Sequence, residues 1–212
     1  MTANRAGATT ASRAGVVLAG GAGERFGEAE KALAEFEGEP MLRHVVDAVA
    51  AVTDEVVVNC RADQREAFVA ALPHDVSYAV DPEPDLGPVA GLGTALDEVT
   101  APVVAVVACD MPAVDTTFLR YLFERLGGND AAVPGLPSDR LQPAQAVYRT
   151  APLREAAAES LAAGVGSLHD VVDRLQAGIV PPAEVQQVTT WRSLADVNTP
   201  AALDALAAGE VP

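Results

Sequence analysis

One lysine stands in this chain of 212 residues, and its neighbours are typical of a phosphate-binding site. Lys31 is the single lysine among fourteen basic residues. It follows residues 18–27 (LAGGAGERFG), whose glycines allow close backbone approach and leave N–H groups exposed. Such amides cradle phosphate oxygens, and an ammonium adds a compact positive charge. We therefore predict that Lys31, with Arg25 from the same segment, contacts the phosphates of a ligand.

Two familiar phosphate loops differ from this segment. A Walker loop places its lysine directly after a glycine and before Ser or Thr, whereas Lys31 lies four residues past Gly27 and precedes alanine. A dinucleotide fingerprint reads Gly-x-Gly-x-x-Gly, and here one residue too many separates Gly23 from Gly27. The spacing therefore argues against both a Walker-type NTPase and a hydride-transfer enzyme.

The elements that must position these residues alternate along the chain. Short, valine-rich runs predict strands at residues 15–18, 55–59, 76–80 and 103–108, and a further pair at 131–133 and 144–148. Helical spacing covers residues 41–52, 64–71, 88–99, 116–126, 151–163 and 168–176. We therefore predict an α/β fold: a three-layer α/β/α sandwich with a mostly parallel, Rossmann-like sheet.

Polar positions follow four of the predicted strands. The glycine segment follows the first strand, and Asn59, Asp81 and Asp110 come at or after the ends of the next three. Ligands of parallel sheets bind beyond the carboxyl ends of the strands, so these side chains should meet at one edge. A single carboxylate together with phosphate oxygens can hold Mg²⁺, which keeps several waters. Asp110 is therefore the predicted metal ligand.

Each of these positions also has a purely structural alternative. Asp110 could be a turn or capping carboxylate, and Asn59 and Asp81 could be turn formers. Arg25 could be a solvated loop charge, and Asn198, before Thr-Pro, could cap a last helix. The residues alone leave these alternatives open, while the meeting of four positions at one edge favours ligand binding.

The overall charge limits the classes of partner. Thirty acidic residues against fourteen basic ones give a formal net charge of −16. Such a surface repels nucleic acid and anionic lipid, so we expect neither as a partner. No apolar stretch approaches the ~20 residues of a membrane helix. The acidic balance with almost no lysine also predicts a halophilic protein, adapted to high salt.

The remaining composition suggests one cytoplasmic domain. Cys60 and Cys109 are far apart and form neither a disulfide framework nor a zinc motif, which fits a reducing compartment. Residues 1–13 are small and polar and predict a disordered leader rather than a signal peptide. We expect residues 14–212 to form a single domain.

The string Leu-Ala-Gly-Gly-x-x-x-Arg-Phe-Gly-x-x-x-Lys over residues 18–31 resembles the signature of nucleotidyltransferases with a glycosyltransferase-A-like, nucleotide-diphospho-sugar transferase-like fold. Three further segments resemble the molybdenum cofactor guanylyltransferase family: residues 87–91 (GPVAG), 108–112 (ACDMP) and 196–200 (DVNTP). The resemblance runs from about residue 15 to 206 with the motif order intact, and it implies that residues 14–212 form a single nucleotidyltransferase domain.

The resemblance implies a role for each matching residue. Lys31, Arg25 and Asp110 would be catalytic, with Asp110 also holding Mg²⁺. The substrate side would comprise Gln142, with Pro143 beside it, together with Asp196 and Asn198. The nucleotide-binding set would be Leu18, Ala19, Gly20, Gly21, Lys31, Asn59, Asp81, Pro88, Gly91 and Asp110.

The reaction that the resemblance implies is transfer of GMP from GTP to the phosphate of Mo-molybdopterin, with release of pyrophosphate. Because the acceptor is itself a phosphate, it is ionised at neutral pH and requires no general base. Cytidylyl transfer to molybdopterin, guanylyl transfer to cobinamide phosphate or phospholactate, and a non-catalytic nucleotide-binding subunit remain alternatives. A monomer or small homo-oligomer, and transient contact with molybdopterin-handling proteins, are also compatible with the resemblance.

Overall fold

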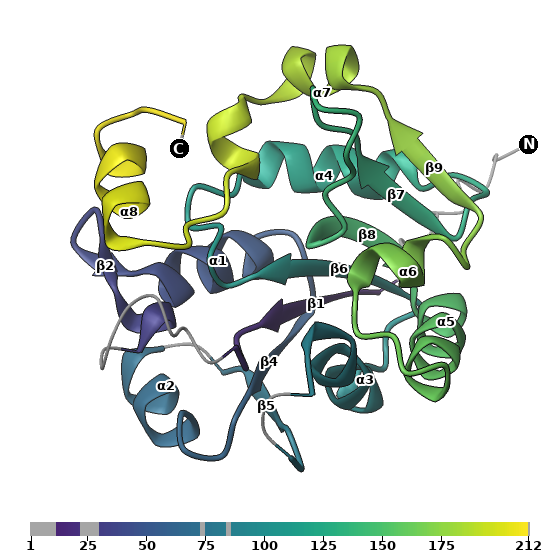
Figure 1. The fold of residues 1–212 in the computed structure, drawn as a ribbon, viewed down its shortest axis with the longest axis horizontal. Helices are drawn as coiled ribbons and strands as arrows, with labels where there is room; N and C mark the ends of the chain where they lie inside the picture. Colours follow the sequence, from purple (N-terminus) through teal and green to yellow (C-terminus); the bar gives the residue numbers. More distant parts are fainter. Residues whose placement is uncertain (1–11, 22–29, 73–74, 84–85, 212) are drawn as a thin grey trace, which may run out of the picture.

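The chain folds around a seven-stranded sheet with the order β5-β4-β1-β6-β8-β7-β9 (Figure 1). The computed structural model describes residues 12–21, 30–72, 75–83 and 86–211. The strands are β1 (Arg13–Leu18), β4 (Glu55–Cys60), β5 (Ser77–Val80), β6 (Val103–Ala108), β7 (Ala131–Pro134), β8 (Gln145–Arg149) and β9 (Ala177–Val180).

Most neighbouring strands run parallel. β1 lies between β4 and β6, parallel to both, and β5 is parallel to β4. β8 runs antiparallel to its neighbours β6 and β7, while β9 is parallel to β7. The carboxyl ends of β1, β4, β5 and β6 therefore open at the same edge of the sheet, as expected from the buried valine-rich runs.

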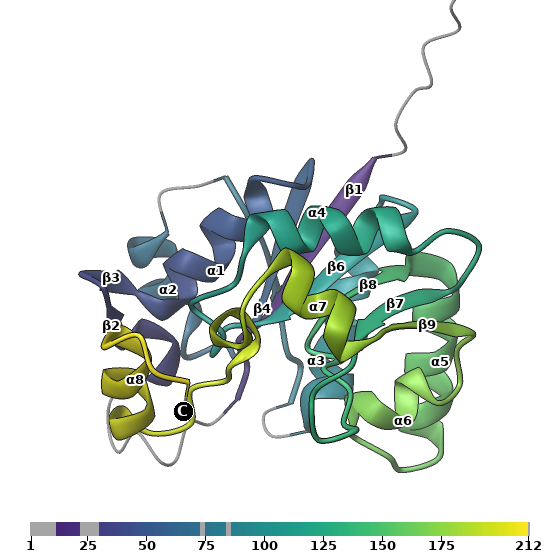
Figure 2. The ribbon, with the colours of Figure 1, turned by 90° about the horizontal axis from the view of Figure 1, so that it is seen from above.

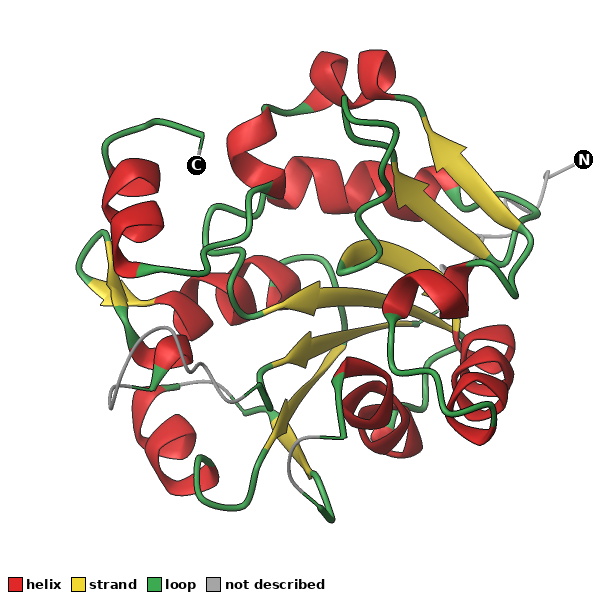
Figure 3. Cartoon of the chain, viewed as in Figure 1, coloured by secondary structure: helices red, strands yellow, loops and turns green. Residues whose placement is uncertain are grey.

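Helices cover both faces of this sheet and produce the predicted three layers (Figures 2 and 3). On one face pack α1 (Met41–Ala50), α2 (Arg65–Ala71), α4 (Thr116–Arg125) and α7 (Pro182–Val188). On the other face pack α3 (Pro88–Glu98), α5 (Thr150–Ala162) and α6 (Leu168–Val172). The α/β/α sandwich with a mostly parallel sheet is confirmed.

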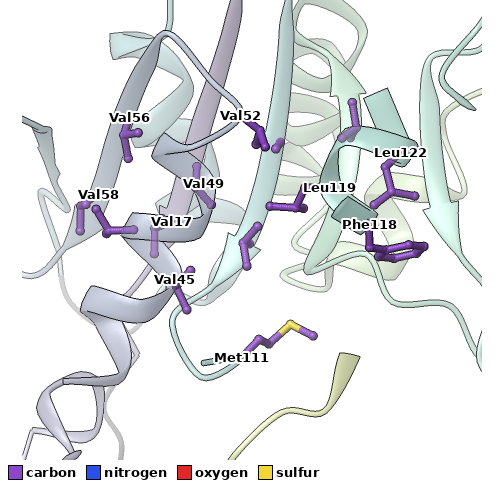
Figure 4. Packing of buried hydrophobic residues seen from close by; sticks show 14 of the residues in the cluster. Val17, Val45, Val49, Val52, Val56, Val58, Met111, Phe118, Leu119 and Leu122 are labelled. Atoms are coloured by element: carbon purple, nitrogen blue, oxygen red, sulfur yellow. The ribbon is translucent and has the colours of Figure 1, made fainter. Parts of the chain in front are cut away.

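The first of these layers is held by small aliphatic side chains (Figure 4). Val45 and Val49 lie one turn apart on α1 and face Val17 of β1 in the same fully buried cluster. Phe118 and Leu122 repeat this spacing on α4. Burying one such side chain stabilises the fold by roughly 1.5–3 kcal/mol. Apolar side chains spaced one turn apart on α1 and α4 thus pack against the valine-rich strands and hold these helices in place on the sheet.

Smaller elements gather at the edge where the strands end. A hairpin of β2 (Glu35–Phe36) and β3 (Glu39–Pro40) turns at Glu37 and Gly38, which have φ of 50° and 90°. The final helix, α8 (Pro200–Ala207), is capped by Thr199, whose hydroxyl accepts from the Ala202 N–H. Its apolar side packs on Phe36 and Met41. In Figure 1 the arrowheads of β1 and β6 point toward this hairpin and α8.

The structure corrects two element boundaries and adds elements that the sequence did not predict. The helix expected at 168–176 ends at Val172, and residues 177–180 form strand β9. Helix α7 and the β2–β3 hairpin fall where no element was predicted. β1 begins at Arg13, inside the expected leader, because that residue pairs with Val103; residues 1–11 lie outside the described part of the chain.

Candidate active site

A cavity of about 710 Å³ opens at the carboxyl ends of the parallel strands. Its walls come from the ends of β1, β4, β5 and β6, the first turn of α3, the β7–β8 loop, and the segment between η3 (Trp191–Leu194) and α8. Every predicted site residue in the described part of the chain except Pro143 lines it: Leu18, Ala19, Gly20, Gly21, Lys31, Asn59, Asp81, Pro88, Gly91, Asp110, Gln142, Asp196 and Asn198. Arg25 lies outside the described residues.

Lys31 occupies the centre of a charged cluster. Its Nζ atom donates to Asp110 Oδ2 at 2.7 Å and to Asn198 Oδ1 at 2.9 Å. The side chains of Lys31 and Asp110 are only 14% and 20% exposed, so water screens this ion pair less than a surface pair. Asp110 lies 79 positions and Asn198 lies 167 positions from Lys31 in the chain, and the fold brings both to the same ammonium group.

Backbone contacts fix each member of this cluster. Lys31 begins the short helix η2 (Lys31–Leu33), which Glu30 caps by accepting from the Ala32 N–H at 3.4 Å. Asp110 lies two residues beyond β6, and its carbonyl accepts from the Val197 N–H at 2.8 Å. That bond brings the Asp196–Asn198 segment against the end of β6. Asp196 in turn accepts from the Asn198 amide.

Electrostatics makes this cluster attractive to a further cation. Burial raises the pKa of Asp110; the Lys31 ammonium opposes this effect, and the Asp196 carboxylate adds to it. Both carboxylates line the same cavity, where burial limits the solvation of Asp110. Positive charge from a ligand would relieve their repulsion.

A second polar pair lies between two glycines. Asn59 Nδ2 donates to Asp81 Oδ1 at 2.7 Å and to the Ala79 carbonyl at 3.3 Å. A Cβ atom on Gly91 would lie 2.4 Å from Asn59 Oδ1, and one on Gly20 would lie 2.6 Å from Asp81 Oδ2. Both glycines are therefore required for space, and any side chain there would displace the pair.

The Asp81 carboxylate is half-buried in this arrangement. Burial raises the pKa of Asp81, while hydrogen bonds from Asn59 and Thr94 and the charge of Arg61 oppose the rise. Its backbone N–H donates to the Cys60 carbonyl at 2.9 Å, which fixes the residue at the end of β5. An oriented carboxylate beside a carboxamide is a suitable acceptor–donor pair for a heterocyclic base or a ribose.

The contacts of Asp110, Asn198 and Asn59 differ from those of helix caps and turn formers. Helix α4 is capped by Asp115 and helix α8 by Thr199, so neither Asp110 nor Asn198 serves as a helix cap. Asn59 lies within β4 and is 2% exposed, with its side chain turned to Asp81 rather than into a turn. Asp110 and Asn198 instead bind the Lys31 ammonium, and Asn59 binds Asp81.

The predicted substrate side belongs to the same cavity. Gln142 lies in the β7–β8 loop, and its amide donates to the Leu194 carbonyl at 3.3 Å. That bond joins the loop to the segment carrying Asp196 and Asn198. Pro143 differs from the expectation, because it is buried and its carbonyl accepts from the Tyr148 hydroxyl at 2.7 Å.

Several residues at the cavity were not predicted from the sequence. Glu30, Arg140 and His169 also line the cavity, and Arg61 reaches the glycine segment from the end of β4. Arg61 follows Asn59 by two residues, which is the signal that could have drawn attention to it. A lone arginine on a loop, such as Arg140, carries none.

Sequence comparison decides the family. The family model of the MobA-like NTP transferase domain matches residues 15–178, which include the cavity residues up to His169. The chain belongs to the MobA-like NTP transferase family. The matched stretch contains most of β1, Lys31, the Asn59–Asp81 pair and Asp110, while the cavity wall at Asp196 and Asn198 lies beyond it.

Relatives within this family have long, well-covered alignments. The chain is 41% identical to a "probable molybdenum cofactor guanylyltransferase" of Natronomonas pharaonis, covering 91% of this chain and 95% of that protein. It is 31% identical to the molybdenum cofactor guanylyltransferase of Pseudomonas entomophila, covering 87% and 93%. The family fold is thus shared over nearly the whole chain.

Solved structures agree on the fold. The molybdopterin-guanine dinucleotide biosynthesis protein A of Archaeoglobus fulgidus matches with a TM-score of 0.75 at 23% identity, covering 92% of this chain and 97% of that one. A nucleotidyl transferase of Methanothermobacter matches with a TM-score of 0.75 at 18% identity, covering 93% and 97%. None of the helices in the described part of the chain has the length and apolar content that a membrane crossing requires.

Proposed function

We propose that this protein is a molybdenum cofactor guanylyltransferase, which transfers GMP from GTP to the phosphate of Mo-molybdopterin. The observation that carries the proposal is the Lys31–Asp110–Asn198 cluster in one cavity with the Asn59–Asp81 pair. One group is suited to phosphates and the other to a nucleoside. The names of the relatives support the choice of guanine nucleotide and molybdopterin acceptor.

In the proposed reaction an oxygen of the acceptor phosphate attacks the α-phosphorus of GTP. The new P–O bond forms as the bond between that phosphorus and the bridging oxygen to the β-phosphate breaks, and pyrophosphate leaves with the electron pair. The protein's tasks are alignment and charge neutralisation, because the nucleophile is already ionised. Lys31, Arg25 and the amides of Gly20 and Gly21 would bind the triphosphate.

The donor set fits Mg²⁺. Among the described residues no group of three or more His, Cys, Asp or Glu side chains could hold a metal by itself, so phosphate oxygens must complete the coordination. Asp110 supplies a carboxylate beside the Lys31 ammonium, and phosphate oxygens and waters would supply the other ligands. Mg²⁺ bound there would supply positive charge to the triphosphate.

The remaining parts of the proposal concern the acceptor and the setting. Gln142, Asp196 and Asn198 form the wall assigned to the pterin, next to the Asp110 carboxylate. Residues 14–212 would act as one nucleotidyltransferase domain. A cytoplasmic setting is supported by the free thiols of Cys60 and Cys109, both of which have their pKa raised by burial.

The deciding experiment measures pyrophosphate release from each of the four NTPs with Mo-molybdopterin as acceptor. We expect release with GTP and Mg²⁺ and the appearance of the guanine dinucleotide by mass spectrometry. Release from CTP instead would establish the cytidylyl alternative. GTP binding without product from molybdopterin, cobinamide phosphate or phospholactate would establish a non-catalytic subunit.

A further inference from the structure

Arg61 lies one residue beyond β4 and turns its guanidinium toward the glycine segment. Its side chain is only 15% exposed. Nη1 donates to the Gly21 carbonyl at 2.7 Å and to the Gly20 carbonyl at 3.2 Å. Nη2 lies 3.5 Å from Glu30 Oε2, and Nε donates to Asp63 Oδ1 at 3.1 Å. One planar fork thus contacts backbone and carboxylate together.

These partners flank the segment that joins β1 to η2. Gly20 and Gly21 come directly after β1, and Glu30 is the cap of η2, whose first residue is Lys31. The guanidinium therefore connects both ends of that segment from a strand that lies 31 to 41 positions further along the chain. Lys31 is reached through Glu30, and the backbone of Gly20 and Gly21 is reached directly.

The direction of these contacts matters for an anionic ligand. In a trans peptide the C=O and the N–H point to opposite sides, so a Gly20 carbonyl bound to Arg61 directs the Gly21 N–H away from the guanidinium. Glu30 lines the cavity, and its negative charge would repel phosphates if it were not paired. Arg61 thus binds three oxygens that would otherwise repel a phosphate: the carbonyls of Gly20 and Gly21 and the Glu30 carboxylate.

We propose that Arg61 is a positioning residue that clamps the two ends of the phosphate-binding segment, holding the backbone of Gly20 and Gly21, with the Gly21 amide, and the ammonium of Lys31 in place for a triphosphate. The triphosphate part rests on the proposed function; the clamp itself does not. The alternative is a surface pair with Asp63. Asp63 accepts from Nε at 3.1 Å and from Nη2 at 3.2 Å, but it is 71% exposed, so water screens this pair. A pair with Asp63 alone also leaves the bonds from Nη1 to the Gly20 and Gly21 carbonyls without a purpose.

The first test compares Arg61→Ala and Arg61→Lys with Arg65→Ala. Arg65 provides a matched loss of charge on α2; it lies over the Tyr78 ring at 5.6 Å, away from the glycine segment. Amide hydrogen exchange is followed in peptides covering residues 18–21 and 30–34. We expect faster exchange there in Arg61→Ala, an intermediate rate in Arg61→Lys, and wild-type rates in Arg65→Ala.

The second test titrates the same proteins with GTP in the presence of Mg²⁺. Loss of charge-assisted hydrogen bonds should weaken binding by about tenfold to a hundredfold in Arg61→Ala, with partial rescue in Arg61→Lys. Glu30→Gln combined with Arg61→Ala should be no worse than Arg61→Ala alone, because both changes open the same clamp. A merely structural role would instead give additive losses.

Two results would overturn the clamp: unchanged exchange at 18–21 and 30–34 in Arg61→Ala, or wild-type GTP affinity in that variant. A wild-type protein that binds no nucleoside triphosphate would refute the proposed function instead. In that case the exchange rates alone decide whether Arg61 holds the two ends together.

Discussion

At the scale of single residues, Lys31 shows why a point charge suits this site. Its ammonium fits between Asp110 Oδ2 and Asn198 Oδ1, at 2.7 and 2.9 Å. A guanidinium is larger and planar and cannot occupy that position without moving one of the two oxygens. The geometry of the site therefore explains why a lysine stands at this position in a chain whose other basic residues are all arginine.

Replacement of Lys31 gives the first prediction. We expect Lys31→Ala to lower turnover by about a hundredfold to a thousandfold, because a charge directed at the triphosphate is lost. Lys31→Arg should recover little of it. Steady-state rates of pyrophosphate release measure both effects, and thermal unfolding checks that the variants remain folded. Full activity in Lys31→Arg would mean that only the charge matters.

Asp110 gives the second prediction. Asp110→Asn keeps the shape of the side chain but removes its charge. Mn²⁺ can stand in for Mg²⁺ as a paramagnetic probe, and we expect it to bind the GTP-bound variant more weakly than the GTP-bound wild type. Electron paramagnetic resonance measures free Mn²⁺ directly and does not depend on turnover. Asp204→Asn, on α8 and away from the cavity lining, is the control. Equal Mn²⁺ affinity in Asp110→Asn and the wild type would remove Asp110 from the metal site.

At the scale of elements, helix α3 offers a matched pair of glycines. A Cβ atom on Gly91 would lie 2.4 Å from Asn59 Oδ1, whereas one on Gly93 would meet only Leu161 Cδ1 at 3.7 Å. We expect Gly91→Ala to raise the Kd for GTP by about tenfold by displacing the Asn59–Asp81 pair. Gly93→Ala should leave the Kd unchanged and stabilise the helix by up to about 1 kcal/mol. Calorimetric titration and thermal unfolding distinguish the two, and identical Kd values would contradict the assignment of the pair.

The elements also show what the sequence could predict. Buried valine runs marked β1, β4 and β6, and the residues at their ends led directly to the cavity. β9 was missed because its four residues include a glycine and the exposed Ile179, so no continuous apolar run marks it. The β2–β3 hairpin was missed because a Glu-Gly turn is a weaker signal than Asn-Gly or Asp-Gly. The contacts of Arg61 depend on tertiary placement, which spacing along the chain does not reveal.

At the scale of the whole molecule, the formal net charge of −16 gives the fourth prediction. Repulsion among surface carboxylates opposes the compact state, and salt screens it, since the Debye length falls from about 10 Å at 0.1 M to about 3 Å at 1 M. We expect the midpoint of thermal unfolding to rise as KCl increases toward about 3 M. A midpoint that is constant or falls over that range would argue against adaptation to high salt.

The bond between the Val197 N–H and the Asp110 carbonyl joins two parts of the chain that differ in what they contribute. Residues up to Val180 contain every strand of the seven-stranded sheet, whereas Asn198 belongs to a segment that adds no strand to it. The architecture of the sheet and the second contact of the Lys31 ammonium therefore have separate origins in the chain. A substitution in the segment around Asn198 should thus alter the polar cluster while every strand of the sheet stays in place.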